Sequence, residues 1–212
     1  MSPLYAIVDV DVCTAAGRTP TAVAEAFLRA GVSHVQIRAK RLGSGAFLAL
    51  VTHLAPAAEA VGAHLIVNDR VDVAKTAGLG VHLGQSDLPV KDARRLLGPD
   101  AIIGCSTHTP AELAAALIEP VTYVAYGPVF PTATKANPDP AVGLEGVRFA
   151  AGRAASAGKA LVAIGGITLS TARPVTNAGA RAVAIISDLL RNGEDPGARA
   201  SQFLSALRTE PV

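Results

Sequence analysis

The chain has 212 residues, half of them hydrophobic and only 4% aromatic, so its core must be built from Ala, Val, Leu and Ile. This length suits a single α/β barrel domain of about 200–250 residues. A formal net charge of +2 without a basic run argues against a nucleic-acid partner. No apolar stretch reaches the roughly 20 residues that span a bilayer, and we expect neither a membrane segment nor a signal peptide. Cys13 and Cys105 form no paired motif, which predicts reduced thiols in a cytoplasmic protein.

Short apolar runs alternate with longer, alanine-rich runs along the chain. Most apolar runs are continuous instead of alternating with polar residues, which is typical of parallel strands buried on both faces. The candidate strands are residues 4–9, 34–38, 64–68, 80–84, 101–106, 123–127, 160–166 and 182–187. Eight strand–helix units predict one single-domain (β/α)8 barrel over residues 1–212. The alternative is an open doubly wound sheet, which usually has fewer strands.

Capping signals mark several helix boundaries. Thr19 followed by Pro20 predicts the start of one helix. Thr109, Pro110 and Glu112 have the spacing of a capping box at the start of another. Pro56 lies inside a helical pattern and should kink that helix or end it early.

Residues 131–143 contain three prolines and no apolar periodicity. Long loops in compact domains are often functional. We expect a mobile loop between the sixth strand and the sixth helix that closes over the active site.

Polar side chains follow most of the candidate strands, and the active sites of such barrels lie at the carboxyl ends of the strands. Gln36, Arg38 and Lys40 alternate, so an extended backbone places all three on one face. Near a barrel mouth that face is the lumen, where two cations and an amide predict an anionic ligand. The alternative is that these side chains are solvated on the surface.

Asp69 and Asp87 follow two consecutive strands, which are usually neighbours in this fold. The two carboxylates could therefore meet above the rim. They could form a salt-bridge network with Lys40 and Lys135. Beside a diphosphate they would suit Mg2+, which typically takes one or two carboxylates, waters and phosphate oxygens.

A second anion site is expected after the seventh and eighth strands. Gly165 and Gly166 precede a helix that begins near Thr168, and Ser187 follows the eighth strand. Glycine turns and helix N-termini expose backbone N–H groups to phosphates. His82 is best read as a satisfied residue of the barrel interior, and His108 is open between packing at a helix start and substrate contact.

Seven segments, in order along nearly the whole chain, resemble thiamine-phosphate synthase: VQIRAK (35–40), IVNDRVDVA (66–74), GVHLGQSDLP (80–89), IIGCSTHTPAE (102–112), YGPVFPTATK (126–135), VAIGGI (162–167) and AIIS (184–187). The resemblance implies a (β/α)8 transferase of thiamine biosynthesis. Such enzymes join 4-amino-2-methyl-5-(hydroxymethyl)pyrimidine diphosphate to 4-methyl-5-(2-phosphoethyl)thiazole, and release diphosphate by a dissociative route through a pyrimidine carbocation. A homodimer is also implied.

The resemblance also carries residue roles, which are expectations here. Mg2+ is expected on Asp69 and Asp87, and catalytic roles on Arg38, Lys40, Ser106 and Lys135. The pyrimidine diphosphate is expected on Gln36, Ile37, Arg38, Ala39, Lys40, Asn68, Ser106 and Lys135. The thiazole phosphate is expected on Thr132, Ala133, Thr134, Gly166, Ile186 and Ser187. The family often has Glu where this chain has Ala39, whose side chain should face away from the lumen.

Three other functions stay open from the sequence. A thiazole tautomerase shares the fold and many motifs but loses part of the diphosphate machinery. The retention here of Lys40, Asp69, Asp87 and Lys135 favours the synthase. A phosphate-binding barrel without activity, or another phosphate-handling barrel such as an epimerase or aldolase, are the remaining alternatives.

Overall fold

Eight strands form one closed barrel in sequence order in a computed structural model that describes residues 1–132, 140–191 and 193–208. All neighbouring pairs are parallel, and β8 pairs with β1 to close the ring. The strands are β1 (Leu4–Asp9), β2 (His34–Arg38), β3 (His64–Asn68), β4 (Gly80–Leu83), β5 (Ile103–Thr107), β6 (Tyr123–Tyr126), β7 (Ala160–Ile164) and β8 (Ala182–Ile185). The predicted (β/α)8 barrel is confirmed, and the open sheet is excluded.

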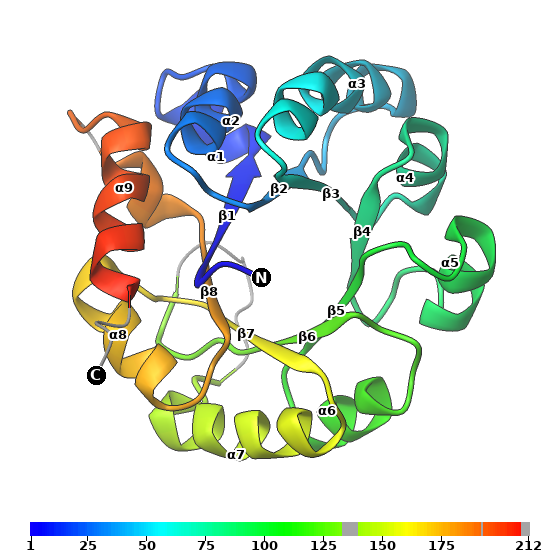
Figure 1. Ribbon diagram of the computed structural model, residues 1–212, viewed down its shortest axis with the longest axis vertical. Helices are drawn as coiled ribbons and strands as arrows, with labels where there is room; N and C mark the ends of the chain where they lie inside the picture. The colour runs from blue at the N-terminus through cyan, green and yellow to red at the C-terminus, as the bar shows by residue number, and fades with distance from the viewer. Residues whose placement is uncertain (133–139, 192, 209–212) are drawn as a thin grey trace.

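The helices surround the barrel as an outer ring, which Figure 1 shows from one end. They are α1 (Val10–Ala15), α2 (Pro20–Arg29), α3 (Ser44–Ala60), α4 (Val71–Ala77), α5 (Val90–Leu97), α6 (Pro110–Leu117), α7 (Gly143–Ser156), α8 (Leu169–Asn177), the 3-10 helix η1 (Ser187–Leu190) and α9 (Pro196–Leu207). The last helix, α9, packs against both α8 and α2, so it closes the outer ring between the first and last helices.

The predicted capping residues begin their helices. The Thr19 side chain accepts a hydrogen bond from the Ala22 N–H at 3.3 Å, and the Thr109 side chain accepts one from the Glu112 N–H at 3.2 Å. Only half of the predicted capping box forms, however. The Glu112 carboxylate accepts from the His108 N–H, at 2.7 Å, instead of from the Thr109 N–H.

Of the two outcomes expected at Pro56, a kink or an early end of the helix, the early end is wrong, because α3 continues to Ala60. A proline inside a helix deprives the carbonyl group four residues earlier of its partner. That residue is Thr52, which is exposed, so water can take the place of the missing N–H.

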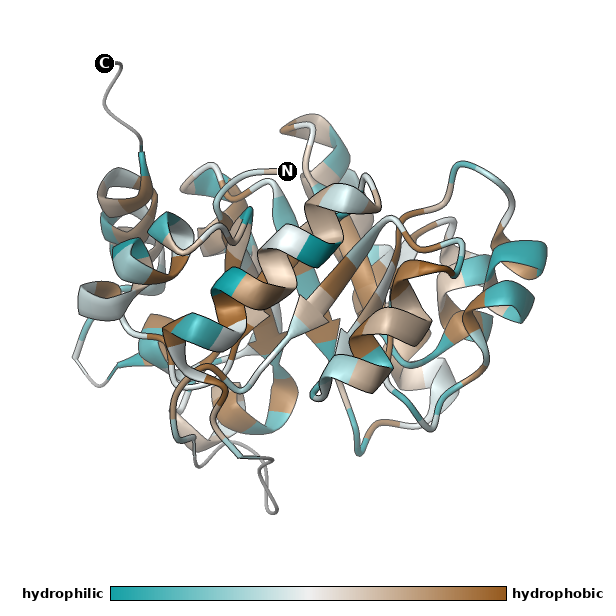
Figure 2. Ribbon diagram, turned by 90° about the horizontal axis from the view of Figure 1, so that it is seen from below, coloured by the Kyte–Doolittle hydropathy of each residue, from teal (hydrophilic) through white to brown (hydrophobic). Residues whose placement is uncertain are grey.

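Two apolar cores hold the fold together. The larger one lies between the strands and the helices and includes Phe27, Phe47 and Phe203, all fully buried. The smaller one fills the barrel interior; its buried members are Tyr5, Ile7, Ile66, Tyr123, Ala125, Val162, Ala182 and Ala184. Figure 2 shows hydrophobic colouring on the strands and on parts of the surrounding helices.

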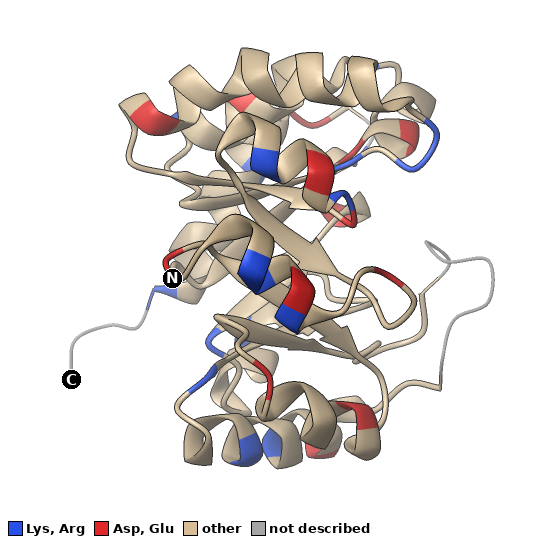
Figure 3. Cartoon of the chain, turned by 90° about the vertical axis from the view of Figure 1, so that its right-hand side faces the viewer, with Lys and Arg blue, Asp and Glu red and all other residues tan. Residues whose placement is uncertain are grey.

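Charged residues lie mainly on the helices and loops, with both signs interspersed, as Figure 3 shows. Across the described part of the chain, no helix combines the length and the apolarity that crossing a membrane requires.

Candidate active site

A cavity of about 1130 Å³ opens at the carboxyl ends of the strands. Most of the site residues predicted from the sequence line it: Gln36, Arg38, Lys40, Asn68, Asp69, Asp87, Ser106, Thr132, Gly166, Ile186 and Ser187. Gln36 and Arg38 of β2, with Lys40 just beyond the strand, thus line the same cavity, as their spacing predicts.

Some predicted residues do not line this cavity. The side chains of Ile37 and Ala39 are buried in the core between the barrel and the helices, so only their backbone atoms could serve a ligand. Ala133, Thr134 and Lys135, with most of the loop expected to be mobile, lie outside the described residues.

An acidic pair stands at the rim beyond β3 and β4. Asp69 follows β3 in the left-handed conformation, with a φ of 64°, and its N–H donates to the His82 carbonyl group at 2.8 Å. Its carboxylate forms an ion pair with Lys40, at 2.9 Å between Nζ and Oδ2. The Asp87 carboxylate accepts from the Gly84 N–H at 2.7 Å. The salt bridge to Lys40 that the sequence allowed is therefore present.

The environment of Asp87 suits a cation. Burial raises the pKa of its carboxyl group, and the neighbouring Asp69 raises that pKa further, while the Gly84 N–H and Lys40 act in the opposite direction. Among the described residues, no group of three or more His, Cys, Asp or Glu side chains gathers as a metal cage. Two carboxylates beside an open cavity do fit Mg2+, which keeps waters and phosphate oxygens as its other ligands.

Arg38 has a partner that the sequence did not suggest. It forms an ion pair with Asp9, which is 2% exposed and also caps α1 by accepting from the Val12 N–H at 3.1 Å. The parallel register places Asp9 directly beside Arg38. The sequence does place an aspartate at the end of the first strand. Its pairing with Arg38 could not be inferred without the register between β1 and β2.

The opposite side of the cavity is built from the turn after β7 and the segment after β6. The Phe130 N–H donates to the Gly165 carbonyl group at 3.0 Å. Gly166 has a φ of 65°, and a Cβ atom there would lie 2.6 Å from the Pro131 carbonyl oxygen. Only glycine fits this close approach, which holds Thr132 and the β7 turn on the same cavity wall.

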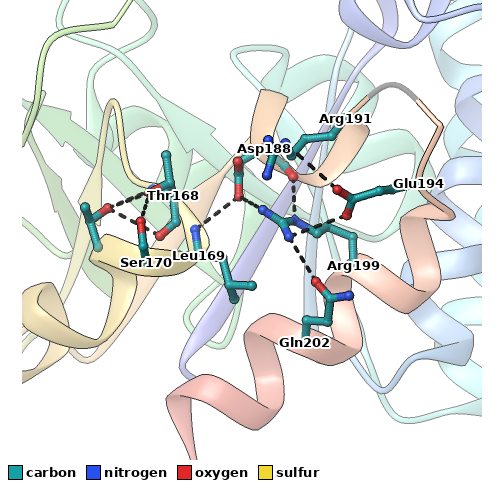
Figure 4. A network of polar contacts seen from close by, with 9 residues as sticks. Thr168, Leu169, Ser170, Asp188, Arg191, Glu194, Arg199 and Gln202 are labelled. Atoms are coloured by element: carbon teal, nitrogen blue, oxygen red, sulfur yellow. Dashed lines mark hydrogen bonds and ion pairs between the residues drawn. The ribbon is translucent and has the colours of Figure 1, made fainter.

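A partly buried ion pair between Asp188 and Arg199 supports the turn after β8, where Ser187 begins η1 (Figure 4). The Asp188 carboxylate accepts from the Leu169 N–H at the start of α8, at 3.1 Å, and from Arg199 of α9, at 2.7 Å. Arg199 also donates from Nε to the Asp188 carbonyl group at 3.1 Å. The Asp188 carboxylate thus links η1 to α8 through Leu169 and to α9 through Arg199, a role that was not foreseen from the sequence.

A continuous chain of buried polar side chains forms the floor of the cavity. The Gln36 amide nitrogen donates to the Tyr5 hydroxyl at 3.0 Å, and the Tyr5 and Tyr123 hydroxyls lie 2.7 Å apart. His82 lies between the Tyr123 hydroxyl, 2.9 Å from its Nδ1, and the Ser106 hydroxyl, 2.8 Å from its Nε2. His82 is an interior residue with partners on both nitrogens, as expected, but both tyrosines were missed.

Neither cysteine is activated as a nucleophile. Burial raises the pKa of Cys13 to about 12 and that of Cys105 to about 11, so both thiols stay protonated at neutral pH. His108 contacts Glu112 at the start of α6, as the helix-start role predicts; it also lines the cavity, and its contact with a substrate stays a prediction. The arrangement suits electrostatic catalysis on anionic ligands better than attack by a side chain.

The comparisons with known proteins agree with this chemistry. The family model described as thiamine monophosphate synthase matches residues 4–189. The thiamine-phosphate synthase of Koribacter versatilis is 43% identical over 97% of this chain and 96% of its own. That of Albidiferax ferrireducens is 44% identical over 91% of this chain and 86% of its own.

A solved structure shows the same fold with related chemistry. Thiamine phosphate pyrophosphorylase from Pyrococcus furiosus superposes with a TM-score of 0.81 at 30% identity, covering 96% of this chain and 94% of the other. Match length, identity and fold all point the same way, and this chain belongs to the thiamine monophosphate synthase family.

Proposed function

We propose that this chain is a thiamine-phosphate synthase that joins 4-amino-2-methyl-5-(hydroxymethyl)pyrimidine diphosphate to 4-methyl-5-(2-phosphoethyl)thiazole. The observation that carries the proposal is one cavity whose two opposite sides both carry groups that suit a phosphorylated ligand. Lys40, Asp69 and Asp87 stand on one side, and the Gly166 and Ser187 turns stand on the other. Two phosphorylated substrates can therefore lie together over the polar floor.

The wall beyond β2 and β3 would hold the diphosphate. Lys40 and Arg38 supply positive charge there, although each already faces one aspartate. Asp69 and Asp87 would hold Mg2+, which when bound neutralises charge on the departing diphosphate. Preorganised charges of this kind stabilise a leaving group as it becomes more negative. Lys135, outside the described residues, is proposed for the same role from the family resemblance.

The floor would hold the aminopyrimidine ring and the opposite wall the thiazole phosphate, so that the two substrates are positioned to react. Gln36, Asn68 and Ser106 offer amide and hydroxyl groups to the aminopyrimidine. Backbone groups around Gly166, Ile186 and Ser187, with Thr132, would hold the thiazole phosphate. The thiazole nitrogen then attacks the pyrimidine carbocation left by diphosphate, so the protein needs no nucleophile of its own. A homodimer stays a prediction carried by the resemblance.

The direct test is product formation from the purified chain. We expect thiamine phosphate only when both substrates are present, with activity lost in EDTA and restored by excess MgCl2. Binding of the substrates without product would contradict the proposal, and so would isomerisation of a thiazole carboxylate phosphate as the main reaction.

A variant pair sharpens the test. Lys40→Met should lower turnover at least about 100-fold, because it removes a charge beside the diphosphate. Lys91→Met changes an equally long cation whose side chain is 74% exposed on α5, and should leave turnover unchanged. Equal rates in the two variants would refute the assignment of the diphosphate wall.

A further inference from the structure

The chain of hydrogen bonds on the cavity floor has a direction, which follows from counting protons. Each phenol has one proton to donate, and burial raises the pKa of Tyr5 and Tyr123 above the ordinary value, so both keep it. Tyr5 accepts from the Gln36 amide nitrogen. Its own proton is therefore directed to the Tyr123 hydroxyl, 2.7 Å away.

The same count continues to the other end of the chain. Tyr123 accepts from Tyr5, so it donates its proton to Nδ1 of His82. In a neutral imidazole one nitrogen accepts and the other donates. The acceptor is then Nδ1, and Nε2 carries the proton and donates to the Ser106 hydroxyl oxygen at 2.8 Å. The hydroxyl proton of Ser106 is left to point at a ligand in the cavity.

The packing around this chain leaves little room for another arrangement. Tyr5 and Tyr123 are each 1% exposed, Gln36 is 2% exposed and His82 is 7% exposed. A Cβ atom on Gly104 would lie 2.1 Å from Cζ of Tyr123 and 2.5 Å from Nδ1 of His82. A glycine at this strand position therefore creates the space in which the tyrosine and the histidine meet.

Every side chain in this network has a hydrogen-bond partner, and a fully satisfied buried network holds its members in fixed positions. All five members of this hydrogen-bond chain line the cavity, and its two ends, Gln36 and Ser106, are the ones proposed to contact the aminopyrimidine. The aminopyrimidine ring presents hydrogen-bond donors and acceptors in fixed positions. Gln36 and Ser106 must therefore each offer the complementary group, a donor or an acceptor, to the ring.

We propose that the chain Gln36–Tyr5–Tyr123–His82–Ser106, here called the floor relay, is a positioning device that fixes Ser106 as a hydrogen-bond donor to the pyrimidine. His82 and Tyr123 act through Ser106 and do not touch the reacting atoms. Because every link must reverse together, the relay also couples the orientation of the Gln36 amide to that of the Ser106 hydroxyl. The proposal rests on the proposed function for the identity of the ligand, but the polarity of the relay does not.

The first test reads the relay without any substrate. Nitrogen-15 NMR of the histidine side chains, with the His82 signals assigned by their loss in His82→Gln, should show His82 with its proton on Nε2. In Tyr123→Phe the donor to Nδ1 is gone, and a population with the proton on Nδ1 should appear. Wild-type His82 protonated on Nδ1, or an unchanged tautomer in Tyr123→Phe, would overturn the proposal.

The second test is kinetic and uses the same substitution. Tyr123→Phe should lower kcat/KM for the pyrimidine diphosphate about tenfold, the worth of one ligand hydrogen bond, and leave the KM of the thiazole phosphate within about twofold. Tyr126→Phe is the matched control, since Tyr126 lies on the same strand but packs in the outer core. A purely structural role for Tyr123 would change both KM values or neither, and either result would refute the relay.

Coupling between the ends of the relay gives the decisive comparison. If Tyr123 acts through Ser106, the double variant Tyr123→Phe/Ser106→Ala should be no slower than Ser106→Ala alone, within about threefold. Multiplying effects would contradict the relay. Tyr5→Phe breaks the relay one link earlier and serves if Tyr123→Phe does not fold, as judged by its melting temperature. A wild-type chain that makes no thiamine phosphate would refute the proposed function, while the NMR result would still decide the relay's polarity.

Discussion

At the scale of single residues, Asp69 combines a rare backbone conformation with an ion pair. It has the only left-handed φ found at a non-glycine position in the described part of the chain, and its carboxylate faces Lys40. Asparagine tolerates this conformation, so Asp69→Asn removes the charge with little change in the backbone. The substitution therefore separates metal binding from folding.

We expect Asp69→Asn to lower turnover about 100-fold or more at low MgCl2 and to raise the MgCl2 concentration needed for half-maximal activity. The reason is that Mg2+ would lose one of its two protein carboxylates. Asp72→Asn is the control, because Asp72 lies three residues away and pairs only with Arg70 among the ion pairs of the described residues. Identical MgCl2 dependence in wild type and Asp69→Asn would exclude Asp69 as a ligand.

Another residue-scale prediction concerns pH and lies far from the site. His34 is 6% exposed, and burial lowers its pKa from 6.5 to about 4, with His64 and the N-terminal amino group adding to the effect. Protonation therefore favours the unfolded chain. The contribution of neutral His34 is complete above pH 6.5 and is lost as pH falls towards 4, by about 2 kcal/mol at pH 5.

Urea unfolding at pH 7.5, 6 and 5 measures this loss. His34→Gln can keep a hydrogen bond near Ser33 but cannot be protonated, so its free energy of unfolding should fall less between pH 7.5 and 5 than that of the wild type. His53→Gln, at an exposed position, should follow the wild-type curve. Parallel curves for wild type and His34→Gln would show that His34 is not the titrating group.

Residue types at this scale were readable from the sequence, but their partners were not. Alternation in Gln36, Arg38 and Lys40 indicated one polar face, and the structure places all three on the cavity. The pairing of Arg38 with Asp9 depends on the register between β1 and β2, which the sequence does not encode locally. Tyr5 and Tyr123 were missed because a continuous apolar run does not say which of its side chains face the barrel interior.

At the scale of elements, the cavity wall around Ser187 depends on the contacts that Arg199 of α9 makes with Asp188 of η1. This guanidinium is buried and makes contacts to Asp188, Gln202 and Glu194. Arg199→Lys keeps the positive charge but loses the forked geometry that reaches several acceptors at once. The turn after β8 should then be held less firmly against the start of α8.

We expect Arg199→Lys to raise the KM of the thiazole phosphate about tenfold while the KM of the pyrimidine diphosphate stays within about twofold, because one lost hydrogen bond to a charged group is worth about 1.5–3 kcal/mol. Arg153→Lys makes the same change at an exposed position on α7 and should alter neither value. Steady-state kinetics with each substrate varied in turn decides the matter. A rise in both KM values would point to general loosening of the fold instead.

Element existence was predictable here, and element ends were less so. All eight strands lie where apolar runs predicted them, because parallel strands buried on both faces leave a strong signal. The run ending at Gly166 was expected to be strand, yet β7 stops at Ile164. The segment after β6 crosses that turn, and such a long-range contact cannot be seen in the local sequence.

At the scale of the whole molecule, barrel closure creates the site. β8 pairs with β1, which in turn pairs with β2, and this brings the Ser187 turn near the cavity wall that contains Arg38. Small side chains such as Ala125 and Ala184 line the interior and leave the cavity open above the floor. Strand order was inferred from the alternation of elements, whereas the depth of the cavity follows from packing that only the closed ring defines.

Closure also predicts how the molecule unfolds. Phe203 of α9 is fully buried in the core shared by the barrel and the helices, and α9 contacts α2, α8 and β1. Phe203→Ala should therefore lower the free energy of unfolding by about 3–5 kcal/mol, the usual cost of emptying such a site. Phe149→Ala, at a position 48% exposed on α7, should change it by less than about 1 kcal/mol.

The stronger expectation is that helix content and activity are lost together in Phe203→Ala, since α9 joins the two ends of the ring. Circular dichroism and product formation, followed along one urea titration, should give the same midpoint, and that midpoint should be lower than in the wild type. Two separated transitions, with α9 lost first and the active barrel persisting, would mean that the last helix only covers the ring. In that case closure by β1 and β8 alone would be enough to hold the two walls of the cavity together.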